Sequence, residues 1–161
     1  ENGEPIAYIT GTRLYNELGL TTQIPTTLRV ASWDKMIKTK IGNLVVKPAK
    51  SYAPVSKGNI PFLQLLDVMK DFKKIPDLDI KKGVDFLKKK IKGLSNTDRM
   101  QLVDLAKSYP PKVRAFLGAL LEALSFKEMS EPLKNTLNYL SNYELGISEK
   151  ILTTTTNWKI S

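Results

Sequence analysis

Residues 8–25 read YITGTRLYNELGLTTQIP and change within a few positions from an extended to a helical pattern. Residues 6–9 are mostly apolar and include an aromatic side chain, which predicts a short strand. Leu14 and Leu18 are spaced to share one face of a short helix, which we expect to end at Gly19. A strand that passes directly into a helix indicates a mixed α+β fold.

Hydroxyl and amide side chains flank this short helix. Thr10 and Thr12 precede its apolar positions, and either hydroxyl can cap the first turn. Thr21, Thr22 and Gln23 follow the glycine and can satisfy exposed backbone groups of the turn. On this interpretation the polar residues of the segment are structural.

The extended pattern continues to about residue 47. Residues 26–33 predict a second strand, and residues 35–41 and 44–47 predict a hairpin around the turn Gly42-Asn43. The side chains that we expect in water are Lys38, Lys40 and Lys47, and those available to the core are Ile37, Ile41, Leu44 and Val46. Together these segments predict a small N-terminal mixed sheet with a short helix and a hairpin.

From residue 59 onward, apolar residues recur with the period of a helix. They predict a bundle of about five helices, whose apolar stripes begin at Phe62, Ile80, Leu102, Val113 and Leu133. The fourth stripe is the widest, so this helix should lie in the centre of the core.

The remaining predictions concern the C-terminal end of the chain and the boundary between its two subdomains. The fifth helix is expected over residues 131–143, and the threonine-rich residues 151–160 predict a C-terminal strand. Residues 48–58 have the composition of a connection. We therefore expect a β-rich subdomain over residues 1–50 and a helical subdomain with a terminal strand over residues 59–161, packed together as one compact unit.

The chain contains no cysteine and no histidine. Their absence excludes disulfides, zinc–thiolate sites and every Ser-His or Cys-His catalytic arrangement. We expect no catalytic residues, no metal, no cofactor and no small-molecule substrate. The longest apolar stretch, residues 115–124, has about half the length of a bilayer span. Residues 1–5 do not resemble a secretory signal peptide, so we expect a cytoplasmic protein without a membrane segment.

The net charge of +9 is concentrated between Lys35 and Lys92, where fifteen lysines accompany five aspartates. Such asymmetry favours an anionic partner, either DNA or RNA or an acidic protein surface. The lysines around the second predicted helix form the candidate partner surface: Lys81, Lys82, Lys88, Lys89, Lys90 and Lys92. Arginine is missing from this stretch, which favours a solvated or protein-facing surface over a primary nucleic-acid reader. Tyr52 or Trp33 would offer aromatic surfaces on which the bases of a nucleic-acid strand could stack.

Aspartates are the best candidates for catalysis. Asp77 and Asp79 lie in a Pro-containing loop and could seat a divalent cation, and Asp67 and Asp71 are one helical turn apart. Helix caps and solvated charges account better for both pairs. A carboxylate-dependent metal nuclease is therefore one alternative function, and a simple basic nucleic-acid-binding module is another.

Residues 8–25 closely resemble the TG…LGL(S/T)TQ(V/I)P signature of the AbiEi-type antitoxins, transcriptional regulators of bacterial abortive-infection, type IV toxin–antitoxin systems. The signature positions in this sequence are Gly11, Leu18, Gly19, Thr21, Thr22 and Gln23. Residues 107–115, 142–147 and 158–160 are similar to the helical end of the same proteins.

The resemblance implies a longer protein with two parts. An N-terminal winged helix-turn-helix would bind inverted repeats in its own promoter, and a C-terminal domain would support repression and oppose a nucleotidyltransferase-like toxin. Seven residues precede Tyr8, so the resemblance covers the C-terminal portion without the winged-helix domain. It implies a non-catalytic effector domain whose partner is the cognate toxin and which assists autoregulation by a separate DNA-binding domain.

Overall fold

The computed structural model describes residues 3–38 and 40–161, and the chain forms two compact units, Glu1–Leu78 and Asp79–Ser161. The fold is α+β, as predicted, with a small mixed sheet followed by helices. The predicted division between residues 50 and 59 differs from the observed one, which follows Leu78. The reason is that the first long helix packs against the sheet and so belongs to the β-rich unit.

The first unit contains a four-stranded sheet in the order β1-β2-β4-β3. Its strands are β1 (Ala7–Thr10), β2 (Thr27–Ser32), β3 (Lys40–Ile41) and β4 (Leu44–Lys50). Strands β1 and β2 are antiparallel, β2 and β4 are parallel, and β3 pairs antiparallel with β4. The predicted mixed sheet and hairpin are therefore present.

The strand predicted over residues 35–41 is shorter than expected. Among the described residues of this segment the strand β3 comprises Lys40–Ile41, because the hydroxyl of Ser32 donates to the carbonyl of Lys35 and holds a bend after β2. Val46 is buried as predicted, Ile37 and Leu44 are half-buried, and Lys38, Lys40 and Lys47 are exposed. The side chain of Ile41, which was assigned to the core, lies outside the described residues.

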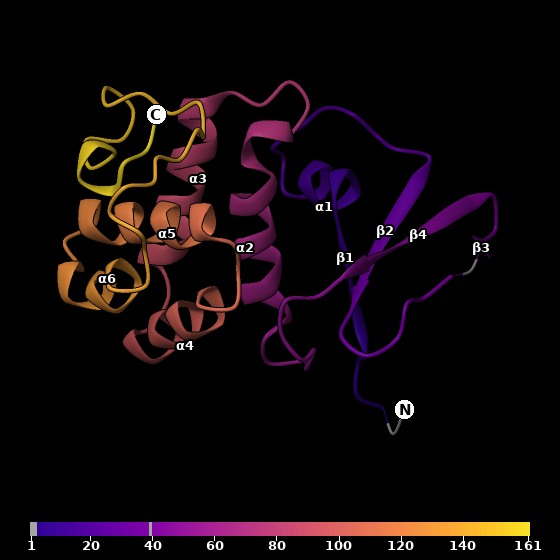
Figure 1. Ribbon diagram of the computed structural model, residues 1–161. Coiled ribbons are helices and arrows are strands. Elements are labelled where there is room, and N and C mark those ends of the chain that lie inside the picture. The colour runs from indigo at the N-terminus through magenta and orange to yellow at the C-terminus, as the bar shows by residue number, and fades with distance from the viewer. Residues whose placement is uncertain (1–2, 39) are drawn as a thin grey trace. The chain divides into compact units, whose positions relative to one another are not determined.

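Two helices lie beside the sheet in this unit, α1 (Thr12–Glu17) and α2 (Ile60–Asp71), and a 3-10 turn, η1 (Phe72–Lys74), follows α2 (Figure 1). Leu14 of α1 is buried, and the helix ends before Gly19, whose φ of 76° suits a residue without a Cβ. Helix α2 begins with Pro61 in its first turn and buries most of its side chains, including Leu63 and Leu66.

The second unit contains four helices and a short 3-10 turn. They are α3 (Ile80–Lys92), α4 (Asn96–Ala106), α5 (Pro111–Ala123), α6 (Lys127–Lys134) and η2 (Thr156–Trp158). Helix α5 is central, as predicted, since it contacts α3, α4, α6 and η2 and buries Phe116, Leu117 and Leu120 completely. Asp79 and Ser95 cap the starts of α3 and α4 with side-chain hydrogen bonds.

Two predictions for the C-terminal part are wrong. Helix α6 ends at Lys134, because the hydroxyl of Thr136 donates to the carbonyl of Leu133 and the chain then turns. Leu140, which lies in the second half of the predicted helix, is 72% exposed. Residues 151–160 form turns and η2 in place of a strand, and their one β-bridge in the described chain joins Ile160 to Tyr143.

Within residues 3–38 and 40–161, no helix combines the length and the apolar composition needed to cross a bilayer.

Candidate functional site

The signature segment surrounds α1 and supplies hydrogen bonds within the first unit. Gly11 precedes the helix with a φ of 76°, and Leu18 ends it half-buried. Thr21 is buried, whereas Thr22 and Gln23 are exposed. The predicted capping by Thr10 or Thr12 is wrong, since α1 has no side-chain capping hydrogen bond from the described residues.

Asp67 of α2 is the acceptor for the end of β1. The hydroxyl of Tyr8 donates to Asp67 Oδ2 at 2.8 Å, and the hydroxyl of Thr10 donates to the same oxygen at 2.7 Å. Asp67 is only 2% exposed, so its interpretation as a solvated charge is wrong. The carboxylate is kept inside the unit because hydroxyl donors compensate its desolvation.

Tyr15 makes a second connection from α1 to α2. Its hydroxyl lies 2.6 Å from Asp71 Oδ2 and 3.0 Å from the backbone carbonyl oxygen of Asp67. Burial and the negative charge of Asp71 raise the pKa of Tyr15 far above its usual range, so the phenol stays protonated. Asp71 also lies 3.9 Å from the ammonium group of Lys70.

The signature threonines bind Asp77 in the loop after η1. Thr21 donates from its hydroxyl to Asp77 Oδ1 at 2.7 Å, and the hydroxyl of Thr22 donates to Oδ2. These hydrogen bonds hold the pKa of Asp77 below its usual value, because they favour the charged carboxylate. The backbone amide of Gln23 in turn donates to the hydroxyl of Thr21 at 3.2 Å. The segment 8–25 is thus a hydrogen-bonding partner of three acids that come much later in the chain.

The aspartates considered for a metal nuclease are distributed among separate structural roles. Asp67 and Asp77 accept the hydroxyls described above, and Asp79 accepts the backbone amide of Lys82 at 3.1 Å as the N-cap of α3. Among the described residues, no three acidic, histidine or cysteine side chains lie together in a way that could hold a metal ion. The described aspartates therefore do not come together as the metal site that a carboxylate-dependent nuclease would need.

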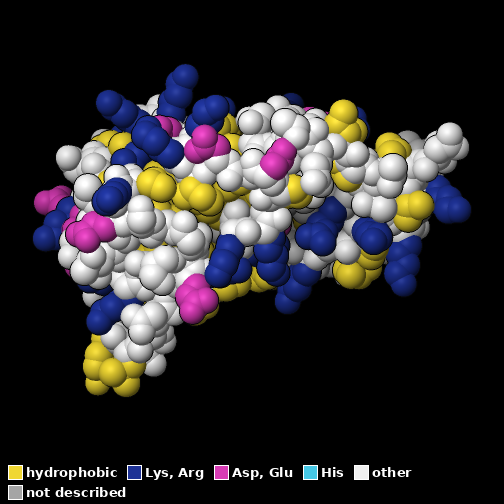
Figure 2. Space-filling view, turned by 90° about the horizontal axis from the view of Figure 1, so that it is seen from above, with side chains coloured by type: hydrophobic (Ala, Val, Ile, Leu, Met, Phe, Trp, Pro, Cys, Tyr) yellow, Lys and Arg dark blue, Asp and Glu magenta, His cyan; other side chains and the backbone are white. Residues whose placement is uncertain are grey.

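The six lysines predicted to form a partner surface lie on α3, away from its buried stripe of Val84, Leu87 and Ile91. Five of them are exposed and Lys88 is half-buried. One acid, Asp85, lies within the helix, and it pairs with Lys81 at 2.8 Å. We call this surface the α3 lysine face. Figure 2 shows lysine and arginine side chains projecting in groups from the surface, with fewer acidic side chains among them.

A hollow in the first unit was not predicted from the sequence. It has a volume of about 280 Å³. Its lining includes three cations from β2, β4 and η1, which are Arg29, Lys47 and Lys74. Gly11, Thr12, Tyr15, Pro25, Thr27 and Asp71 complete it. We call it the basic hollow. The sequence did not predict the hollow because Arg29 and Lys47 are brought together by the register of β2 and β4. That register could not be read from the spacing of the residues alone.

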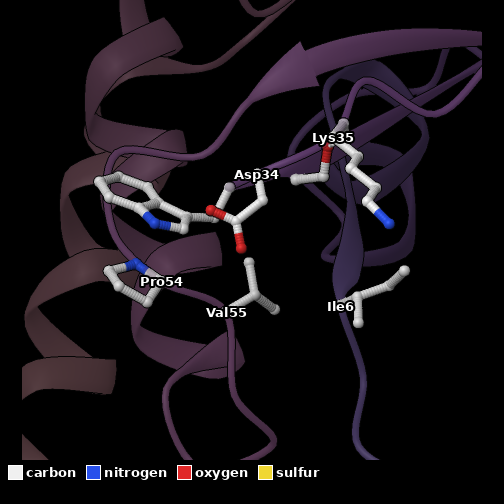
Figure 3. A pocket seen from close by; sticks show the side chains of 7 residues that line it. Ile6, Asp34, Lys35, Pro54 and Val55 are labelled. Carbon is white, nitrogen blue, oxygen red and sulfur yellow. Dashed lines mark hydrogen bonds between the residues drawn. The ribbon is translucent and has the colours of Figure 1, made fainter. Parts of the chain in front are cut away.

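The two aromatics considered for stacking have different environments. Tyr52 is half-buried, and the ammonium of Lys70 lies 5.4 Å from the centre of its ring. Trp33 is 45% exposed and lines a second hollow of about 170 Å³. Figure 3 shows the Asp34 side chain pointing toward Val55, with Ile6 and Lys35 on the other side of the hollow. Trp33 therefore remains available for a contact, whereas one face of Tyr52 has a cation over it.

Comparison of the chain with family models, with curated proteins and with solved structures found no match.

Proposed function

We propose that this chain is a non-catalytic effector domain of an antitoxin-type transcriptional regulator in the cytoplasm of a bacterium. It binds a nucleotidyltransferase-like toxin and assists autoregulation by a separate DNA-binding domain. The resemblance of residues 8–25 to the AbiEi-type signature motivates the proposal.

The observation that carries a binding role is the α3 lysine face. Six lysines and one aspartate on a helix of thirteen residues produce a strongly positive surface, while the buried stripe of the helix fixes its orientation within the unit. A rigid positive face of this kind attracts an acidic protein surface and accelerates its association. Lysine ammonium groups recognise charge more than shape, which suits a protein partner better than the reading of bases.

The test is capture of a partner from a lysate of the source cells with the full chain as bait, in the presence of nuclease and at moderate and high salt. We expect recovery of one nuclease-resistant, nucleotidyltransferase-like protein. The variant K82E/K89E/K92E should lose it, because these three exposed lysines share one side of α3. The variant K112E/K127E/K150E changes the charge of the same unit equally and should retain it.

Three results would contradict the proposal. Recovery of only nuclease-sensitive, salt-labile material would favour a simple basic nucleic-acid-binding module. Magnesium-dependent nicking of supercoiled DNA that disappears in D79N would favour the nuclease. Failure of the chain to restore growth of cells that express the captured toxin would exclude an antitoxin role.

A further inference from the structure

The basic hollow brings together three cations that come from distant parts of the sequence. Arg29 of β2 and Lys47 of β4 are direct partners in the parallel register. Thr10 of β1 is the antiparallel partner of Arg29, and its hydroxyl reaches Asp67 on α2. Partners in neighbouring strands project from the same face of a sheet. Arg29 and Lys47 therefore project from the face that α2 covers, where Lys74 also lines the hollow.

The positive charges of the hollow are not neutralised by the fold. Within the described residues, Arg29, Lys47 and Lys74 form no ion pair with an acid. The one carboxylate in the lining, Asp71, accepts the hydroxyl of Tyr15 and lies near Lys70. Two cations on adjacent strands, about 5 Å apart at the backbone, repel each other when nothing lies between them. An anion in the hollow would relieve this repulsion.

The remaining lining supplies the geometry that an oxyanion needs. Arginine offers a planar fork of N–H donors, and lysine adds a point charge with three donors. Thr12 and Thr27 also line the hollow, and a threonine hydroxyl can donate a hydrogen bond to an oxyanion. Gly11 makes room for the arginine, because a Cβ at this position would stand 3.2 Å from Arg29 Cβ and 3.4 Å from Arg29 Cδ. The signature glycine thus allows the arginine stem to cross the start of α1.

We propose that the basic hollow binds a phosphate group, carried by a nucleotide or by a nucleic-acid backbone. The guanidinium of Arg29 and the ammonium groups of Lys47 and Lys74 hold its oxygens, and Thr12 and Thr27 donate to it. The site is independent of the α3 lysine face, which lies in the other unit, so either proposal can fail without the other.

The test uses amide NMR spectra of the full chain titrated with sodium phosphate, AMP, adenosine, a single-stranded 12-mer DNA and sodium chloride at matched ionic strength. Phosphate and AMP should shift the amide signals of Gly11, Thr12 and Thr27, whereas adenosine and chloride should not. The variant R29Q/K47Q should weaken this binding by about tenfold or more, since it removes two charge-assisted contacts. The variant K127Q/K150Q removes the same charge from exposed positions outside both the hollow and the α3 lysine face, and it should bind as the unchanged chain does.

The arms of the titration separate the two sources of the phosphate group. Tighter binding of the 12-mer than of AMP, with the same amides shifted and the same loss in R29Q/K47Q, assigns the site to a nucleic-acid backbone. Binding of AMP without a response of these amides to the 12-mer assigns it to a nucleotide. Spectra of R29Q/K47Q that match the unchanged chain away from the hollow show that the variant is folded. Shifts spread over all lysine-rich segments, or equal losses in both double variants, would overturn the proposal.

Discussion

Trp158 lies directly against Gly118, so that a Cβ at position 118 would stand 2.2 Å from Cζ3 of the indole. The indole is 2% exposed, and its Nε1–H donates to Glu122 Oε2 at 2.6 Å. A residue near the chain end therefore packs onto the central helix α5, and only glycine leaves room for it.

Substitution of Gly118 by alanine should destabilise the second unit by about 3 kcal/mol, because the fully packed interior has no space for the added methyl group. Urea denaturation followed by tryptophan fluorescence measures the change. The matched control is G93A in the same unit, where the nearest atom to the new Cβ is the Lys89 carbonyl oxygen at 3.4 Å. Equal stability of both variants would show that the indole does not occupy this position.

Replacement of Asp67 by asparagine should cost about 2 kcal/mol of stability in the first unit, because two buried hydroxyls lose a charged acceptor. Thermal denaturation monitored by circular dichroism checks this value. The control D34N removes an exposed carboxylate of the same unit and should change stability little. An unchanged melting temperature in D67N would contradict the role given to the buried carboxylate.

Tyr15 should make the stability of the first unit depend on pH in alkaline solution. Its pKa is raised in the folded state, so its contribution is complete below the unfolded-state pKa of 10.0 and is lost as the pH rises above that value. Denaturation measured from about pH 8 to about pH 11.5 should show a steeper loss for the unchanged chain than for Y15F. Parallel curves for the two proteins would be inconsistent with a phenol kept neutral by burial and by Asp71.

Thr21 and Thr22 should control the ionisation of Asp77. The pKa of Asp77 is lowered in the folded state, so its contribution is present above the unfolded-state value of 3.8 and is lost as the pH falls through the lowered pKa. The variant T21V/T22V should raise this pKa towards 3.8, as measured by carboxyl-carbon NMR. The control Q23A should not, because only the backbone amide of Gln23 takes part in this turn. A low pKa that persists in T21V/T22V would assign the effect to another group.

The sequence was most informative where one side of a helix or strand is buried. The apolar stripes predicted α2 to α5, and the alternating residues predicted the mixed sheet, because the period of buried residues follows the backbone geometry. The prediction of a C-terminal strand was wrong because contacts with distant residues override the local preference for a strand. The β-branched residues 153–156 suit a strand locally, but the hydroxyl of Thr154 donates to the Ala119 carbonyl and the packing of Trp158 requires turns.

The candidate site was predictable only in part. The exposed lysines of α3 followed from the helical period, since charged residues opposite a buried stripe face the solvent. The partners of Asp67 and Asp77 did not follow, because they lie more than fifty positions earlier in the chain. The basic hollow needed the strand register as well, and a shift by one residue would have placed Lys47 on the opposite face of the sheet.

The bonds from Tyr8 and Thr10 to Asp67 also determine when the first unit can form during synthesis. Fifty-seven positions separate Thr10 from its acceptor, so β1 emerges from the ribosome long before α2 exists to receive its hydroxyl. Closing a loop of this length is slow compared with forming a local hairpin. The hydrogen bonds from β1 to Asp67 cannot form until the chain has been synthesised past residue 71. A translation product that stops before α2 would contain strands of the sheet without the helix that packs against them.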